Sequence, residues 1–96
     1  MNGTPGSLDA YDENVLQLCT LEHKSDTVIR VVRYAQFYEV VQFEIPGYNL
    51  RTALKSTLNA QDERIMRDDD GLWHWYLWPT SPTTPEMTDA LLYVIS

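Results

Sequence analysis

The stretch DDDGLWHWYLWP, residues 68–79, decides how this chain folds, because it holds all three tryptophans between a turn signal and a proline. Large side chains alternate along it, and this alternation predicts a β-strand. Trp73, Trp75 and Leu77 would face one side of that strand, and Leu72, His74, Tyr76 and Trp78 would face the other. Aromatic side chains bury roughly 150–250 Å² each, so we expect the first set to nucleate the core. The second set carries polar tips on His74 and Tyr76 and is the better candidate for a contact surface.

Two elements that precede this strand follow from local signals. Asp70-Gly71 is a favoured hairpin connection, which predicts that a short strand over residues 63–67 pairs with the tryptophan strand. Further upstream, Pro46-Gly47 interrupts the chain, and apolar residues then recur at helical spacing. We therefore expect a helix over residues 49–59, with Asn49 as its N-cap.

Three strands are expected before that helix, over residues 15–22, 27–34 and 38–45. Residues 27–38 also show helical spacing, so a helix there stays open, although their β-branched and aromatic side chains favour strands. A tight connection near Ala35-Gln36 would join the second and third strands, unless the two form one long bent strand. In the third, Phe37, Val41, Phe43 and Ile45 share a face opposite Gln42 and Glu44, which predicts one buried face and one wet face.

The C-terminal part reads as a connector followed by a helix. Three prolines stiffen residues 79–85. Thr84 is then expected to cap a helix that begins at Pro85, with Glu86 favourable in its first turn. An apolar stripe at helical spacing runs from Met87 to Ile95, and so short a helix is stable only when that stripe is docked.

Together these elements predict an α+β fold in one small domain. The sheet is antiparallel with four to five strands, one helix follows the first three strands, and a second helix closes the chain. Residues 1–13 are rich in Gly, Pro, Ser, Asn and Asp and are expected to form a flexible N-terminal tail, leaving residues 14–96 as the domain. Ninety-six residues suit one domain with one core.

The charge of the chain points to a class of partner. The net charge is −7, and residues 1–23 and 68–96 contain acidic residues but no Lys or Arg. Such a field repels phosphate backbones, so we expect no direct nucleic-acid binding and favour a basic protein partner. No apolar run reaches the ~20 residues of a membrane span, and the N-terminus lacks signal-peptide features. Cys19 is the only cysteine and cannot form an internal disulfide, which favours a cytoplasmic location.

No motif in the sequence indicates catalysis, a cofactor or a metal. A calcium loop at Asp68-Asp69-Asp70-Gly71 would need further alternating ligands and a terminal Glu, which do not follow. The sequence has neither a nucleophile elbow nor a phosphate-binding glycine loop. We therefore expect a protein that is not an enzyme and binds no cofactor and no metal, and the small-ligand or enzymatic alternative is the weakest.

The sequence hypothesis is a non-catalytic, acidic protein-binding module, in its most specific form an inhibitor of a nuclease or other nucleic-acid-handling protein. Asp68, Asp69 and Asp70 would steer the partner, and His74, Tyr76 and Trp78 would contact it. The alternative is an assembly subunit that forms a homodimer or larger oligomer through its sheet and the stripe from Met87 to Ile95. The same pattern fits equally well a ribbon whose aromatic side chains are all buried, with the acids serving solubility alone.

Overall fold

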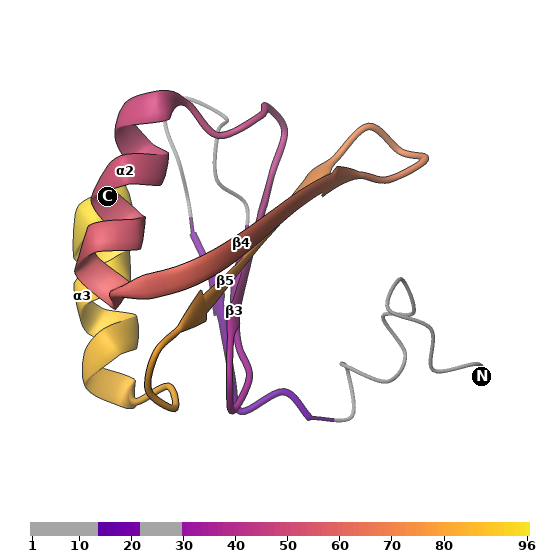
Figure 1. The fold of residues 1–96 in the computed structure, drawn as a ribbon. Helices are drawn as coiled ribbons and strands as arrows, with labels where there is room; N and C mark the ends of the chain where they lie inside the picture. Colours follow the sequence, from indigo (N-terminus) through magenta and orange to yellow (C-terminus); the bar gives the residue numbers. More distant parts are fainter. Residues whose placement is uncertain (1–13, 22–29) are drawn as a thin grey trace.

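Five antiparallel strands form one sheet in the computed structural model, which describes residues 14–21 and 30–96 (Figure 1). The strands are β1 (Gln17–Thr20), β2 (Arg30–Arg33), β3 (Tyr38–Gln42), β4 (Ala60–Arg67) and β5 (Trp73–Pro79). Their order across the sheet is β1-β2-β3-β5-β4, so the tryptophan strand β5 is internal, between β3 and β4. The expected tail at residues 1–13 and the first part of the strand expected at residues 27–34 lie outside the described residues.

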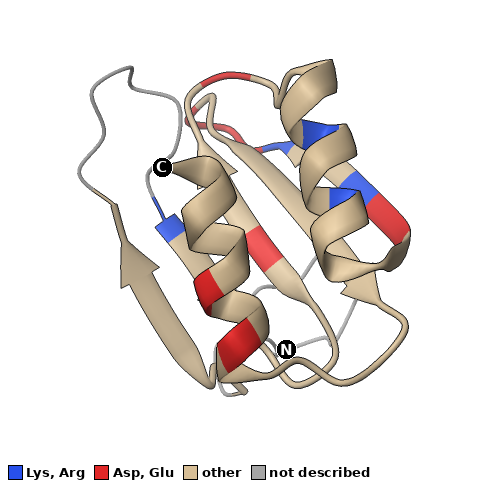
Figure 2. Ribbon diagram, turned by 90° about the vertical axis from the view of Figure 1, so that its left-hand side faces the viewer, with Lys and Arg blue, Asp and Glu red and all other residues tan. Residues whose placement is uncertain are grey.

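Two helices lie on one face of this sheet, α2 (Tyr48–Leu58) after β3 and α3 (Pro85–Ile95) at the C-terminal end (Figures 1 and 2). The predicted α+β architecture is therefore confirmed, including the place of each helix. Thr84 caps α3 as expected, because its hydroxyl accepts a 3.0 Å hydrogen bond from the Met87 amide. The cap predicted for the other helix is wrong: α2 begins after Gly47, with no side-chain cap, and Asn49 lies inside the helix. Within the described residues, no helix is long and apolar enough to cross a membrane.

The core lies between the sheet and the helices. Val31, Val40 and Trp75 occupy one row across β2, β3 and β5, and each has no exposed surface. Leu54 and Leu58 of α2 and Leu91 of α3 complete the same cluster. Trp75 and Leu77 therefore face the core, as the alternation predicted.

The segment that could have been a helix contains two strands. β2 ends at Arg33, the Tyr34 amide donates to the Phe37 carbonyl across 2.9 Å, and β3 begins at Tyr38. This turn contains the connection predicted near Ala35 and Gln36. Residues 27–29 are outside the described part.

The prediction of one buried and one wet face in the third strand is wrong. All five residues of β3 are buried, and Gln42 is only 1% exposed. The strand also ends at Gln42, three residues early, so Phe43 and Ile45 leave the sheet and are each 53% exposed. Pro46 and Gly47 follow closely, and the chain turns there toward α2.

Side chains tie the proline-rich connector to the β2–β3 turn. The Thr83 amide donates to the Ala35 carbonyl across 2.9 Å, and its hydroxyl donates to the Tyr34 carbonyl. Arg33 Nε donates to Thr83 Oγ1 across 3.1 Å. A second link joins Tyr38 Oη and Thr88 Oγ1, 2.8 Å apart, beneath α3. These contacts fix the start of α3 against the sheet.

Candidate functional site

The loop of the β4–β5 hairpin is held by one aspartate. Arg67 pairs with Trp73 at the end of the strands, and the Asp68 amide donates to the Leu72 carbonyl across 2.9 Å. Asp68 Oδ1 accepts from the amides of Asp70 and Leu72, each at 2.9 Å. Gly71 takes a positive φ of 88°, a conformation that glycine adopts without a Cβ penalty. The hairpin connection read from the sequence is therefore present, and Asp68 organises it.

The other carboxylate oxygen of Asp68 faces His74, the second residue of β5. Asp68 Oδ2 lies 2.8 Å from His74 Nε2, and Glu39 Oε2 of β3 lies 2.7 Å from His74 Nδ1. Tyr34 Oη donates to Glu39 Oε1 across 3.2 Å. Both ring nitrogens thus face carboxylate oxygens, and only the doubly protonated imidazolium can donate to both.

The electrostatics of this bridge agree with its geometry. Burial acts to lower the pKa of His74, but hydrogen bonds to Asp68 and Glu39, with their charges, outweigh it and raise the pKa above its ordinary value. The hydrogen bond from His74, followed by that from the Leu72 amide, lowers the pKa of Asp68. We refer to Glu39, His74 and Asp68 as the imidazolium bridge.

Aromatic rings continue from the bridge along the sheet face that lies away from the helices. Tyr76 lies 6.5 Å from His74 and 6.1 Å from Trp78, measured between ring centroids, and Phe37 lies 5.2 Å from Trp78. His74 is only 5% exposed and Tyr76 only 4%, whereas Trp78 is partly exposed. In this conformation His74 and Tyr76 are interior residues, so the side of β5 expected to be an open contact surface is mostly closed.

The acids and Trp78, which the sequence grouped into one site, are at opposite ends of β5. Asp69 and Asp70 are exposed at the hairpin loop, and Asp68 is partly buried beside them. Trp78 is paired with Asp62 near the far end of the hairpin. A partner that contacts the loop would therefore not reach Trp78 through the same small patch.

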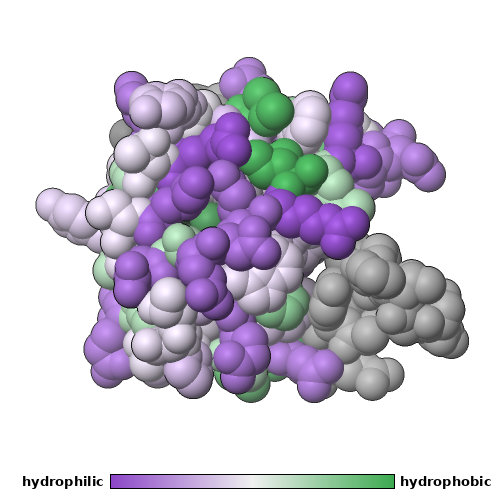
Figure 3. All heavy atoms as spheres, in the orientation of Figure 1, coloured by the Kyte–Doolittle hydropathy of each residue, from purple (hydrophilic) through white to green (hydrophobic). Residues whose placement is uncertain are grey.

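Apolar side chains that the sequence assigned to the core lie instead at the loop end of the sheet. Gln42 of β3 pairs with Trp73 of β5, so the residues after Gln42 leave the sheet at the end where the hairpin loop begins. Figure 3 shows apolar side chains between the β3–α2 connection and the hydrophilic hairpin tip. We define the loop-end surface by its exposed members, Phe43, Glu44, Ile45, Asp69 and Asp70. The available sequence signal was Pro46-Gly47, a break after which the strand could not continue.

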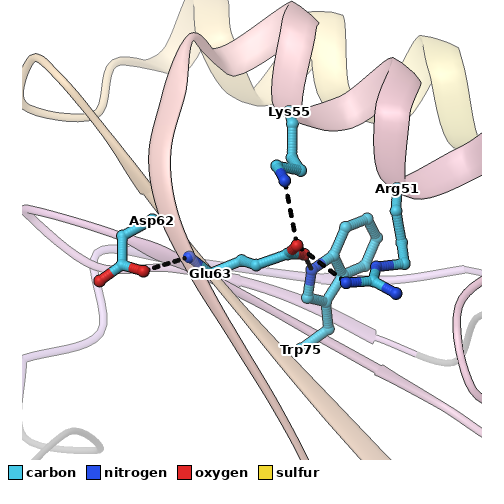
Figure 4. Close-up of polar contacts among 5 residues, drawn as sticks. All are labelled: Arg51, Lys55, Asp62, Glu63 and Trp75. Atoms are coloured by element: carbon cyan, nitrogen blue, oxygen red, sulfur yellow. Dashed lines mark hydrogen bonds and ion pairs between the residues drawn. The ribbon is translucent and has the colours of Figure 1, made fainter.

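A second carboxylate, that of Glu63, is partly buried on the helix side of the sheet (Figure 4). Glu63 Oε2 accepts from Arg51 across 2.9 Å and from Lys55 across 3.1 Å, and Glu63 Oε1 accepts from Trp75 Nε1 across 2.9 Å. Desolvation acts to raise the pKa of Glu63, but these three donors outweigh it and hold the pKa at about 2. With its oxygens engaged and its proton lost, Glu63 fastens α2 to the sheet and is poorly placed for proton transfer.

Among residues 14–21 and 30–96, no three His, Cys, Asp or Glu side chains are grouped so that they could hold a metal ion. The fold and these contacts define a small α+β protein with exposed acids and exposed apolar side chains at the loop end of its sheet. No known family model, curated protein sequence or solved structure matches the chain. The case for a function therefore rests on the loop-end surface and the bridge behind it.

Proposed function

We propose that this chain is a non-catalytic protein-binding module that presents the loop-end surface to a basic protein. The observation that supports this most directly is that Phe43 and Ile45 are exposed at the same end of the sheet as the exposed carboxylates of Asp69 and Asp70. Apolar side chains rimmed by charge have the composition of a protein contact, with the centre driven by burial and the rim by complementary charge.

The shape of the hairpin suits such a contact. The loop lies at the far end of β4 and β5 and extends away from the helices (Figure 1). Its conformation is fixed by Asp68 and Gly71, so Asp69 and Asp70 are presented with little conformational freedom left to lose on binding.

The partner class follows from the charge. The chain carries −7 overall, and a complementary partner has lysine and arginine around an apolar patch. Proteins that handle nucleic acids carry such surfaces for phosphate contact, and occupying one would inhibit it. The specific form of the proposal is therefore an inhibitor of a nuclease or another nucleic-acid-handling protein.

Charge reversal tests the proposal. Asp70→Lys and Asp89→Lys change the net charge equally, but Asp89 is exposed on α3, in the layer on the other side of the sheet. The immobilised proteins are exposed to a lysate at about 0.05 M and about 0.5 M salt, and captured basic proteins are quantified. We expect Asp70→Lys to lose the captured partner, Asp89→Lys to retain it, and high salt to weaken it. Equal capture by both variants, or capture indifferent to salt, contradicts the proposal.

A homo-oligomeric assembly subunit is a second candidate, favoured by one difference between the two sheet edges. At the β4 edge lie Asp62, Glu63, Arg64 and Arg67 and a register irregularity, features that discourage edge pairing. The β1 edge has no charge from Gln17 to Thr20, and Leu18 is 59% exposed. The stripe from Met87 to Ile95 does not serve this purpose in the single chain, because its Leu91 is fully buried in the core.

Sedimentation velocity at micromolar concentration tests this second candidate. A dimer that Leu18→Lys dissociates and Tyr93→Lys leaves intact would support pairing through β1, since Tyr93 is 84% exposed on α3. A wild-type monomer rules this candidate out and leaves the first unaffected.

A further inference from the structure

We infer that the protonated ring of His74 is a latch for the acidic hairpin loop, so that loss of the ring proton releases Asp68 and loosens the surface that Asp69 and Asp70 present. The inference deepens the proposed function and depends on it only for the loop's biological use. Its physical basis is the imidazolium bridge, in which both ring nitrogens need a proton.

The first step concerns what a neutral ring would do. A neutral imidazole has one N–H, and the other nitrogen presents a lone pair. Glu39, which is more deeply buried than Asp68, retains the N–H from Nδ1, because leaving a buried carboxylate without a donor is costly. The lone pair of Nε2 then faces Asp68 Oδ2 at 2.8 Å, and the contact becomes repulsive.

The second step is that only one end of the bridge can move. The side chain of Glu39 is 4% exposed and is also hydrogen-bonded to Tyr34, whereas the side chain of Asp68 is 34% exposed at the edge of a loop. Water can solvate Asp68 once it leaves the ring, but it cannot reach Glu39 without opening the sheet. Release therefore occurs on the loop side.

The third step connects Asp68 to the whole loop. Asp68 Oδ1 holds the amides of Asp70 and Leu72, and the Asp68 carbonyl accepts from the Gly71 amide across 3.1 Å. Rotation of the carboxylate away from His74 breaks the first two contacts together. The two exposed carboxylates then lose the fixed spacing that a partner would recognise.

Other ionisable side chains on this face of the sheet lie near His74 and influence the loss of its ring proton. Arg64 of β4 pairs with Tyr76, one position along the face from His74, and Arg30 of β2 pairs with Val41, which pairs with His74 in turn. Tyr34 is linked to the ring through its hydrogen bond to Glu39. The Tyr76 ring stacks on His74 with 6.5 Å between centroids. Among the described residues, the carboxylates hydrogen-bonded to the ring are those of Glu39 and Asp68, so the ring proton and these two carboxylates control the latch.

Amide hydrogen exchange measured without any partner tests the latch. Protection of the Asp70 and Leu72 amides, corrected for intrinsic exchange, is followed while NMR records the titration of the His74 ring. His23→Gln leaves His74 as the single histidine and serves as the reference protein. We expect protection to fall as the ring deprotonates, by about tenfold for each unit by which its pKa in the latched loop exceeds that in the open loop. Val40 in the centre of the sheet provides the internal control and should not follow this midpoint.

Asp68→Asn makes the test decisive even if a His74 variant fails to fold. Its amide oxygen can still accept from the loop amides, and its NH₂ group can donate to a neutral ring. The fold should remain, and the loop should lose its dependence on the ring proton. Loop protection that is constant through the His74 titration, or unchanged pH dependence in Asp68→Asn, overturns the latch. A functioning latch with no effect of Asp70→Lys on capture contradicts only the binding proposal.

Discussion

Each face of the sheet holds a glutamate, buried in the case of Glu39 and partly buried in the case of Glu63, and each is neutralised by a different kind of cation. On the helix face, Glu63 is held by Arg51 and Lys55, and arginine and lysine are the side chains ordinarily cationic at neutral pH. On the opposite face, Glu39 is held by His74, whose charge changes near neutral pH. The first arrangement is permanent under ordinary conditions, and the second depends on a proton.

One of these ion pairs therefore stabilises the fold, and the other makes part of the same small sheet sensitive to pH. The Glu63 cluster joins α2 to β4 and β5, the part of the molecule that must stay assembled. The imidazolium bridge joins β3 to a surface loop, the part that can move without opening the core. Burial of an ion pair alone does not specify its role, which depends on the chemistry of the cation.

The largest effect should come from a core residue of the helix face. Trp75→Ala removes a fully buried indole and leaves Glu63 without one of its donors, so we expect a loss of about 3–5 kcal/mol in the free energy of unfolding by urea denaturation. Trp78→Ala, on the other face, removes a partly exposed ring and should cost clearly less. Equal losses would show that the two faces contribute equally to stability.

Glu63→Gln should have the next largest effect, about 1–3 kcal/mol at neutral pH, because Arg51 and Lys55 lose their anionic partner. The same group predicts an acid limb in wild-type stability. With a pKa lowered from 4.5 to about 2, Glu63 contributes stability that is present above pH 4.5 and lost as pH falls through about 2. The contribution is on the order of 3 kcal/mol, and a Glu63→Gln protein should lack it in urea melts across this range.

A smaller loss is expected on the alkaline side. The folded-state pKa of His74 is raised, so its contribution is complete below the unfolded value of 6.5 and is lost as pH rises through the folded value. We expect this decline in the free energy of unfolding to begin above pH 6.5. His23→Gln should keep this limb of the stability curve and His74→Gln should lack it. A flat profile above pH 6.5 would remove the distinction drawn between the two glutamates.

Asp69→Asn should have the smallest effect, a change in unfolding free energy within about 0.5 kcal/mol, because its side chain is exposed at the loop. Asp68→Asn in the same loop should shift the His74 titration, which Asp69→Asn leaves nearly unchanged. NMR titration of the ring measures this contrast. Similar shifts of the His74 pKa in both variants would mean that the general negative charge of the loop, not the direct hydrogen bond to Asp68, stabilises the ring proton.

The architecture could be read from the sequence because its signals are local. The Asp70-Gly71 turn, the Thr84 cap before Pro85 and the alternation around Trp75 each depend on residues a few positions apart. Local patterns also separated Trp75 from His74 into opposite faces of β5, as the structure has them.

The site was predictable only in part, because burial and pairing are not local. Alternation shows which residues share a face but not whether that face is covered, so it predicts His74 and Tyr76 as contact residues although they are interior. Glu39 and His74 meet across 35 positions of sequence, and no spacing rule joins them. The sequence pattern predicts that Phe43 is buried, but the structure exposes it, because β3 ends at Gln42. The length of a strand depends on where its neighbours stop pairing, which a local pattern does not show.

The contacts at Thr83 and Thr88 also bear on how the chain folds during synthesis. Arg33 and Tyr38 reach their partners in the connector and α3 over separations of 46 to 50 residues. Leu91 then fills the centre of the core. A ribosome-bound chain that has not yet released α3 lacks Leu91 and the α3 part of the helix layer. We therefore expect this domain to complete its folding only after α3 has left the exit tunnel, and until then to expose Val40 and Trp75 to chaperones.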